Sequence, residues 1–184
     1  MGKINSTIDD SAKQFIEAQP LFFVGSAPLD PDGHVNVSPK GLDTLRILGP
    51  QTIAYLDLTG SGIETVAHLK ENGRIVLMFC AFQGPPRILR LYGRGSVIEP
   101  GHPEFQSLAN RLPGHEGARA VITVEISRIA DSCGFGVPLL KYEEQRSQLA
   151  TWSQKLGPAG LEKYRRERNC RSIDSISGLE KPVG

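Results

Sequence analysis

Short apolar runs, each ended by glycine or proline, dominate the first 130 residues of the chain. Runs of this length and composition are typical of β-strands. The pattern predicts six strands, at 21–27, 34–38, 52–58, 74–82, 87–98 and 119–129. In the last of them, Ile122, Val124 and Ile126 alternate with polar residues, as in a strand with one buried face.

Helical periodicity precedes these strands at 8–18, interrupts them at 64–71 and 102–112, and returns over 141–171. The last segment contains Gly157-Pro158, a pair that breaks helices, so it predicts one or two amphipathic helices. Six strands with so few long connections exclude a doubly wound parallel sheet. We therefore expect a mainly β (α+β) fold, an antiparallel barrel or sandwich flanked by short helices.

The strand at 74–82 stands out because every residue from Ile75 to Phe82 is apolar. A strand of this kind has both faces covered. One face belongs to the core, and the other must meet a helix or another subunit. We interpret 1–138 as the barrel domain with its N-terminal helix, and 139–184 as a helical extension packed on the same domain.

Composition agrees with this interpretation and excludes several classes of protein. The 20 glycines and 13 prolines make up about 18% of the 184 residues, against an average of about 12%, which favours many turns over a helical bundle. The longest uncharged stretches have 12 residues, whereas a membrane span needs about 18. The three cysteines lack metal-binding or paired spacing, and the N-terminus lacks an apolar signal sequence. We expect a cytoplasmic protein with no metal site and no membrane partner.

The segment 58–65 carries the most informative polar pattern, because a strand ends, a turn rich in glycine and hydroxyl groups follows, and a helix begins. The hydroxyls of Thr59 and Ser61 and the backbone N–H groups near Gly62 would form a phosphate cradle at the helix start. Ser61 and Glu64 also match a capping box, so a plain helix cap is the alternative.

Two further groups of residues suit an anion. Ser38 and Lys40 share one side of a predicted strand and leave its end together, where a hydroxyl and an ammonium would bind phosphate. A solvated lysine is the alternative. Arg90, Tyr92 and Arg94 project from the side of their strand that faces away from the core. They fit a cofactor or subunit face, or else an exposed strand with its arginines in solvent.

Three motifs follow one another along the chain: Asn36-Val-Ser-Pro-Lys-Gly41, then Thr59-Gly-Ser-Gly62 before a helix that ends in Glu71-Asn72-Gly73-Arg74, then Gly84-Pro-Pro-Arg-Ile-Leu-Arg-Leu-Tyr-Gly93. Their order and spacing closely resemble the pyridoxamine 5′-phosphate oxidase-like proteins with the FMN-binding split barrel, over roughly residues 15–130. Ser132-Cys-Gly-Phe-Gly-Val-Pro138 in the tail is similar to a bacterial branch of that family.

This resemblance implies a six-stranded antiparallel split β-barrel and a homodimer with two FMN sites at the subunit interface. The partner would cover the second face of the apolar strand. The implied flavin contacts are Ser38, Lys40, Thr59, Ser61, Gly62, Arg87 and Arg90. The implied function is an FMN-dependent oxidoreductase acting on a small molecule. No side chain stands out as a catalytic acid or base.

Three departures from the family pattern argue against a true vitamin B6 oxidase. Gly62-Ile63 stand near the place of an Arg-Lys pair that binds the FMN phosphate, Ile88 replaces a common glutamine, and the tail lacks an Arg-x-His motif. The alternative function is a non-catalytic binding protein for flavin, haem or F420 on the same barrel. Nucleic-acid binding through the basic residues of 163–171 is not expected, because they are spread around the helix.

Overall fold

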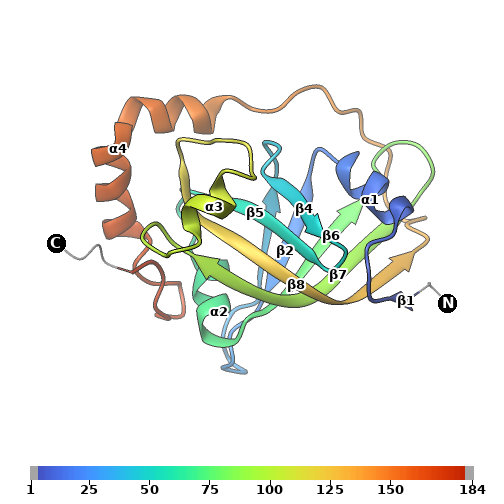
Figure 1. Cartoon of the computed structure of the whole chain (residues 1–184), viewed down its shortest axis with the longest axis horizontal. Coiled ribbons are helices and arrows are strands. Elements are labelled where there is room, and N and C mark those ends of the chain that lie inside the picture. The colour runs from blue at the N-terminus through green and yellow to red at the C-terminus, as the bar shows by residue number, and fades with distance from the viewer. Residues whose placement is uncertain (1–3, 181–184) are drawn as a thin grey trace.

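One antiparallel sheet of eight strands curves around a hydrophobic core in the computed structural model, which describes residues 4–180 (Figure 1). The strand order is β3-β2-β6-β7-β8-β5-β4, and β1 pairs with β8. The strands are β1 Ile4–Asn5, β2 Phe22–Ser26, β3 Asn36–Lys40, β4 Leu45–Gly49, β5 Thr52–Leu58, β6 Arg74–Cys80, β7 Ile88–Ile98 and β8 Ala118–Ser132. The helices are α1 Asp10–Glu17, α2 Glu64–Asn72, α3 Phe105–Ala109 and α4 Gln148–Arg168.

The mainly β, antiparallel architecture that the sequence predicts is confirmed, and all six predicted strands are present. The second of them lies later than predicted, at Asn36–Lys40, and two strands, β1 and β4, were not predicted. β4 has no alternation to reveal it, because its five residues are all half-buried along the edge of the sheet. The barrel is split, since β3 and β4 end the strand order without pairing with each other over the described residues.

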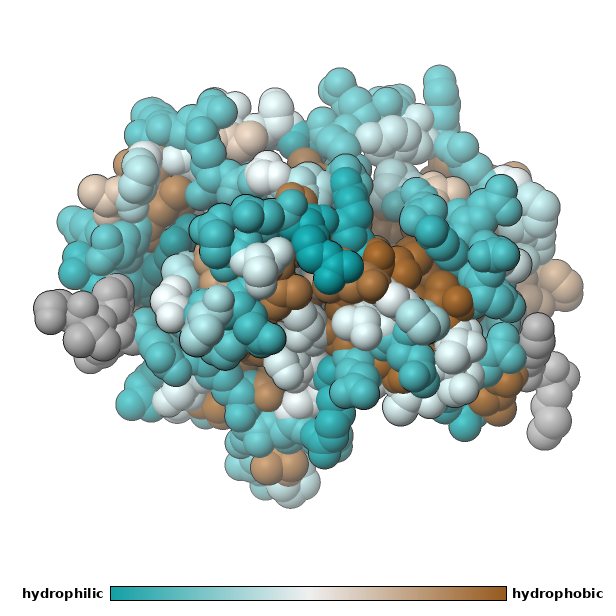
Figure 2. Space-filling model, viewed as in Figure 1, coloured by the Kyte–Doolittle hydropathy of each residue, from teal (hydrophilic) through white to brown (hydrophobic). Residues whose placement is uncertain are grey.

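β5 and β8 lie deep in the molecule, and β5 is covered on both faces. Ile53 and Tyr55 of β5 face the main core, whereas Ala54 and Leu56 belong to a smaller cluster beneath α3. Figure 2 shows that most of this side of the molecule is hydrophilic, with hydrophobic surface between α1 and β4. Hydrophobic residues of both elements, among them Phe15 of α1, pack against the core while only partly buried.

β6 differs from β5 because only one of its faces is covered by the chain itself. Ile75, Leu77 and Phe79 are buried in the core, whereas Val76 and Met78, on the other face, are half-buried. The fully apolar run therefore leaves one face without a complete cover among the described residues.

The helices begin and end where local chemistry dictates. Asp9 caps α1, since its Oδ1 accepts a hydrogen bond from the backbone N–H of Ala12 at 2.8 Å. α2 ends at Gly73 in the left-handed conformation, φ +69°, as predicted. α3 is shorter than predicted, and the predicted break in α4 is confirmed at Gly157, which has non-helical dihedrals. No described helix has both the length and the apolar character to cross a membrane.

The C-terminal segment returns along the molecule from the end of β8 to α4 (Figure 1). On the way, the side chain of Gln145 donates to the carbonyl of Pro20 and accepts from the N–H of Leu42, each at 3.1 Å. After α4, Asp174 contacts both the backbone N–H and the ring of His34. This path brings residues far along the chain to the start of α2.

Candidate functional site

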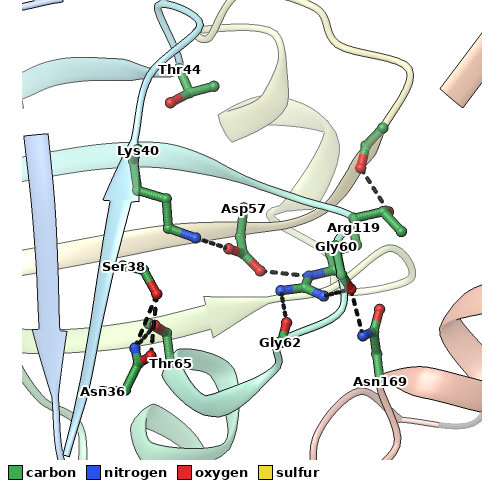
Figure 3. A network of polar contacts seen from close by, with 12 residues as sticks. Asn36, Ser38, Lys40, Thr44, Asp57, Gly60, Gly62, Thr65, Arg119 and Asn169 are labelled. Atoms are coloured by element: carbon green, nitrogen blue, oxygen red, sulfur yellow. Dashed lines mark hydrogen bonds and ion pairs between the residues drawn. The ribbon is translucent and has the colours of Figure 1, made fainter. Parts of the chain in front are cut away.

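Asp57, at the end of β5, joins cations from two other strands (Figure 3). Its Oδ1 accepts from Lys40 Nζ at 2.9 Å, and its Oδ2 accepts from Arg119 Nε at 2.7 Å. Asp57 is fully buried, whereas 19% of the Lys40 side chain is exposed. Burial alone would raise the pKa of Asp57, but attraction to Lys40 and Arg119 outweighs it and lowers that pKa below its ordinary value.

Strand alternation explains why these charges meet inside the barrel. Asp57 follows Ile53 and Tyr55 at two-residue spacing, so it points to the same inner face. Lys40 is paired with Phe22, a core residue, and directly opposed residues share a face of the sheet. The inner face therefore ends in a charged cluster with two cations and one carboxylate.

Arg119 extends this cluster to the loop before α2. Its Nη1 donates to the carbonyl of Gly60 at 3.3 Å and its Nη2 to that of Gly62 at 2.7 Å. Asn169, beyond α4, donates from Nδ2 to the same Gly60 carbonyl at 2.9 Å. The carbonyl oxygens of this loop are thus directed at donors of the chain itself.

Thr59 is also bound within the chain. It is 1% exposed, and its backbone N–H and its hydroxyl both donate to the carbonyl of Gly117, at 2.7 and 2.8 Å. Arg165 of α4 donates from Nε to the Thr59 hydroxyl at 2.8 Å. Burial and the nearby Arg119 guanidinium lower the pKa of Arg165. Thr59 therefore anchors the tail rather than facing open space.

The predicted capping box is wrong, because α2 begins at Glu64. The cap position is Ile63, without a side-chain hydrogen bond, and the first turn contains an acidic residue, Glu64 itself. Ser61 and Gly62 are exposed. The hydroxyls of Thr59 and Ser61 thus do not converge with Lys40 into the predicted cradle.

A set of uncharged polar groups lies between β3 and the first turn of α2 (Figure 3). Asn36 Nδ2 donates to Thr65 Oγ1 at 3.0 Å and to Ser38 Oγ at 3.2 Å. Asn36 and Ser38 are half-buried and share the face of β3 that carries Lys40. We call Asn36, Ser38, Lys40 and Thr65 the polar face.

Arg87 belongs to a different part of the surface. Its Nε and Nη2 donate to Asp131 Oδ2 at 3.0 and 2.7 Å, and its guanidinium lies 4.7 Å from the centre of the Phe15 ring. It lines an open cavity of about 960 Å³ between α1, the loop before β7 and the end of β8. Cys133, exposed, lines the same cavity.

Arg90 lies on the sheet face opposite to the polar face. Across the sheet it is aligned with Met78, Phe23 and Pro39, whereas Lys40 and Ser38 alternate with Pro39 on β3. Its Nη1 donates to Ser132 Oγ at 3.0 Å. Within one chain, the structure therefore brings together Ser38 and Lys40 but not Arg90.

Sequence reasoning missed Asp57, Arg119, Arg165 and Asn169. A charge inside an apolar run, as at Asp57, is a signal that could have found the first. Arg119 likewise begins an apolar strand, but nothing local indicates the two tail residues. His68 was expected on a helix surface, yet it is fully buried, and its Nδ1 lies 3.0 Å from Ser26 Oγ.

Comparison with known proteins identifies the family. A family model described as Pyridoxamine 5′-phosphate oxidase matches residues 8–133. The chain is 40% identical over 194 residues, 96% of this chain and 78% of the relative, to the "Pyridoxamine 5′-phosphate oxidase family protein ustO" of Aspergillus flavus.

Solved structures support the same fold. The Group A Streptococcus protein HupZ gives a TM-score of 0.52 at 22% identity, over 68% of this chain and 99% of that chain. A Clostridium acetobutylicum protein of the pyridoxinephosphate oxidase family gives 0.52 at 14% identity, over 67% and 86%. The antiparallel split barrel and the sequence matches lead to one conclusion: this chain belongs to the pyridoxamine 5′-phosphate oxidase family.

Proposed function

We propose that this chain binds a flavin, FMN being the expected form, between two copies of itself and uses it as an oxidoreductase for a small molecule. Membership of the family and the polar face support this proposal. Asn36, Ser38 and Thr65 offer amide and hydroxyl groups that suit the ribityl hydroxyls of a flavin. The flavin would supply the electron chemistry, and the protein its binding and orientation.

One observation carries the proposal: the predicted flavin contacts lie on opposite faces of the sheet. Ser38 and Lys40 are on the inner face, and Arg90 is on the outer face. Residues on opposite faces of one sheet can meet the same ligand only when a second copy contributes one of the two sets.

The outer face has the character of a surface that a second copy would cover. Val35 and Val37 of the β2–β3 hairpin are 73% and 64% exposed, and Tyr92 is 38% exposed. Val37, Gly25, Val76 and Tyr92 are aligned across four neighbouring strands. Apolar surface shared by adjacent strands is typical of a subunit interface.

The proposed substrate is a small molecule other than a B6 vitamer. The departures from the oxidase pattern remain in the structure, where the first turn of α2 holds Glu64 rather than a basic residue. No histidine lies in the polar face, and the nearest polar partner given for His34 is Asp174.

The purified full chain tests the proposal by its visible absorbance. We expect a flavin spectrum, one flavin per chain, and release of the flavin on denaturation. Ser38→Ala should weaken flavin binding by up to about tenfold, the effect of one hydrogen bond. Ser107→Ala on α3, where the hydroxyl donates to Glu104, is the control and should bind normally. A colourless protein that binds no added FMN would refute the proposal.

A second candidate function is flavin binding without turnover. It is favoured by the lack of an acid or base within the polar face, where every charged partner of Lys40 is already paired. Reduction by NADH or NADPH followed by oxygen uptake distinguishes the two functions. Bound flavin that is never reduced by either donor would indicate a binding protein.

A further inference from the structure

The start of α2 carries a negative charge where a phosphate would otherwise be favoured. A helix N-terminus attracts anions through its free N–H groups and its dipole. Here the first residue of α2 is Glu64, with no basic residue in the first turn. Its carboxylate folds back over the loop, since Oε2 lies 2.6 Å from the point where a Cβ of Gly62 would stand.

The cations near this helix start are already bound to groups of the chain. Arg119 is 5% exposed and uses Nε for Asp57 and both terminal nitrogens for the carbonyls of the loop before α2. Arg165 donates to the Thr59 hydroxyl and to the carbonyl of Ala118. Lys40 shares its charge with Asp57. None of the three presents an unshared charge to a phosphate at the start of α2.

The remaining groups of the polar face are uncharged. Asn36, Ser38 and Thr65 are bonded to one another, and they can exchange those bonds for hydroxyl groups of a polyol. This chemistry recognises the ribityl chain and not the phosphate, which carries nearly two negative charges at neutral pH.

We propose that this chain recognises the uncharged part of its flavin, and that Glu64 cancels the affinity which the phosphate of FMN would add. This inference rests on the proposed function, because it concerns the same site. It predicts that riboflavin binds about as tightly as FMN, within about threefold.

The test is a titration of the full-length, flavin-free chain with riboflavin and with FMN, followed by flavin fluorescence. Glu64→Gln removes the charge and keeps the shape of the side chain, so FMN should bind about tenfold more tightly and riboflavin unchanged. Glu167→Gln removes the same charge from an exposed site on α4 and should alter neither affinity. In the wild type, added salt should strengthen FMN binding relative to riboflavin, because salt screens the repulsion.

The outcomes separate the two proposals. Binding of FMN more than tenfold tighter than riboflavin by the wild type would overturn this inference and leave the proposed function intact. An unchanged FMN affinity in Glu64→Gln would overturn the role of Glu64. If neither flavin binds, the proposed function fails and this inference fails with it.

Discussion

Replacing Asp57 with asparagine tests the buried charge cluster most directly. The substitution keeps the size of the side chain but removes the anion that Lys40 and Arg119 share at 2.9 and 2.7 Å. Removing one partner of a buried ion pair costs about 3–5 kcal/mol, because the remaining charge stays buried. Lys40 is partly exposed and can turn towards water, so we expect a loss of about 3 kcal/mol in the free energy of unfolding.

Urea unfolding, followed by circular dichroism and by the fluorescence of the single tryptophan, Trp152, measures this loss. For a domain of this size, 3 kcal/mol corresponds to a decrease in Tm of about 6–12 °C. Asp43→Asn is the matched control. Asp43 pairs with Arg46 at the surface, with 74% of its side chain exposed, so its replacement should cost less than about 1 kcal/mol.

The pH dependence provides the second part of the test. The pKa of Asp57 is lower in the folded chain than in the unfolded chain, so the carboxylate stabilises the fold above the ordinary carboxyl pKa of about 3.9. That stability is lost as the pH falls through the lowered pKa. The difference between the wild type and Asp57→Asn should therefore be constant near neutrality and narrow in acid. A cost below about 1 kcal/mol at neutral pH would refute the buried cluster.

Three further predictions concern other parts of the fold. Gly134→Ala should destabilise by about 1–3 kcal/mol, because Gly134 has φ +64° and its Cβ would lie 2.9 Å from the Arg87 nitrogen, whereas Gly136→Ala, with open space, should be neutral in the same urea assay. Val37→Lys should shift the chain from dimer to monomer in analytical ultracentrifugation, and Leu156→Lys on α4 should leave the distribution unchanged. Asp174→Asn should speed hydrogen exchange of the His34 amide at neutral pH, since that amide donates to Asp174 at 2.8 Å. The side-chain and backbone hydrogen bonds from His34 lower the pKa of Asp174, so this protection should disappear in acid, and equal exchange rates at neutral pH would contradict the contact.

Local pattern predicted those elements whose ends are marked by residues with special backbone requirements. β5 lies at 52–58 as predicted because a polar, glycine-rich turn follows it directly. The break at Gly157 was readable because proline follows glycine there. β4 was not readable, since an edge strand with both faces half-buried has no contrast between apolar and polar positions.

The register of the β7–β8 pair was beyond local pattern for a related reason. A bulge between Tyr92 and Gly93 shifts the pairing with β8. Gly93 is required there, because a Cβ would lie 2.1 Å from the carbonyl oxygen of Glu125. The sequence shows the glycine, but only the partner strand shows what its missing side chain avoids.

The candidate site divides along the same line. Strand parity placed Ser38 and Lys40 on one face, and the structure confirms that they share it. Parity cannot show that the ammonium of Lys40 meets Asp57, or that the Thr59 hydroxyl accepts from Arg165, a residue 106 positions away. A hydroxyl or cation that suits a ligand in the sequence is available to one only if no distant residue of the chain has bound it first.

This distinction decides which predicted contacts remain open to a ligand. Thr59 is fully buried and bonded to Gly117 and Arg165, so a ligand would have to break the docking of α4 to reach it. Ser38 is half-buried, and its hydroxyl bonds only to Asn36 among the described residues, at distances of 3.2 and 3.3 Å that leave it free to turn towards a new partner. Flavin recognition by this chain should therefore depend on Ser38 and its neighbours on β3, and hardly at all on the glycine-rich loop that first suggested it.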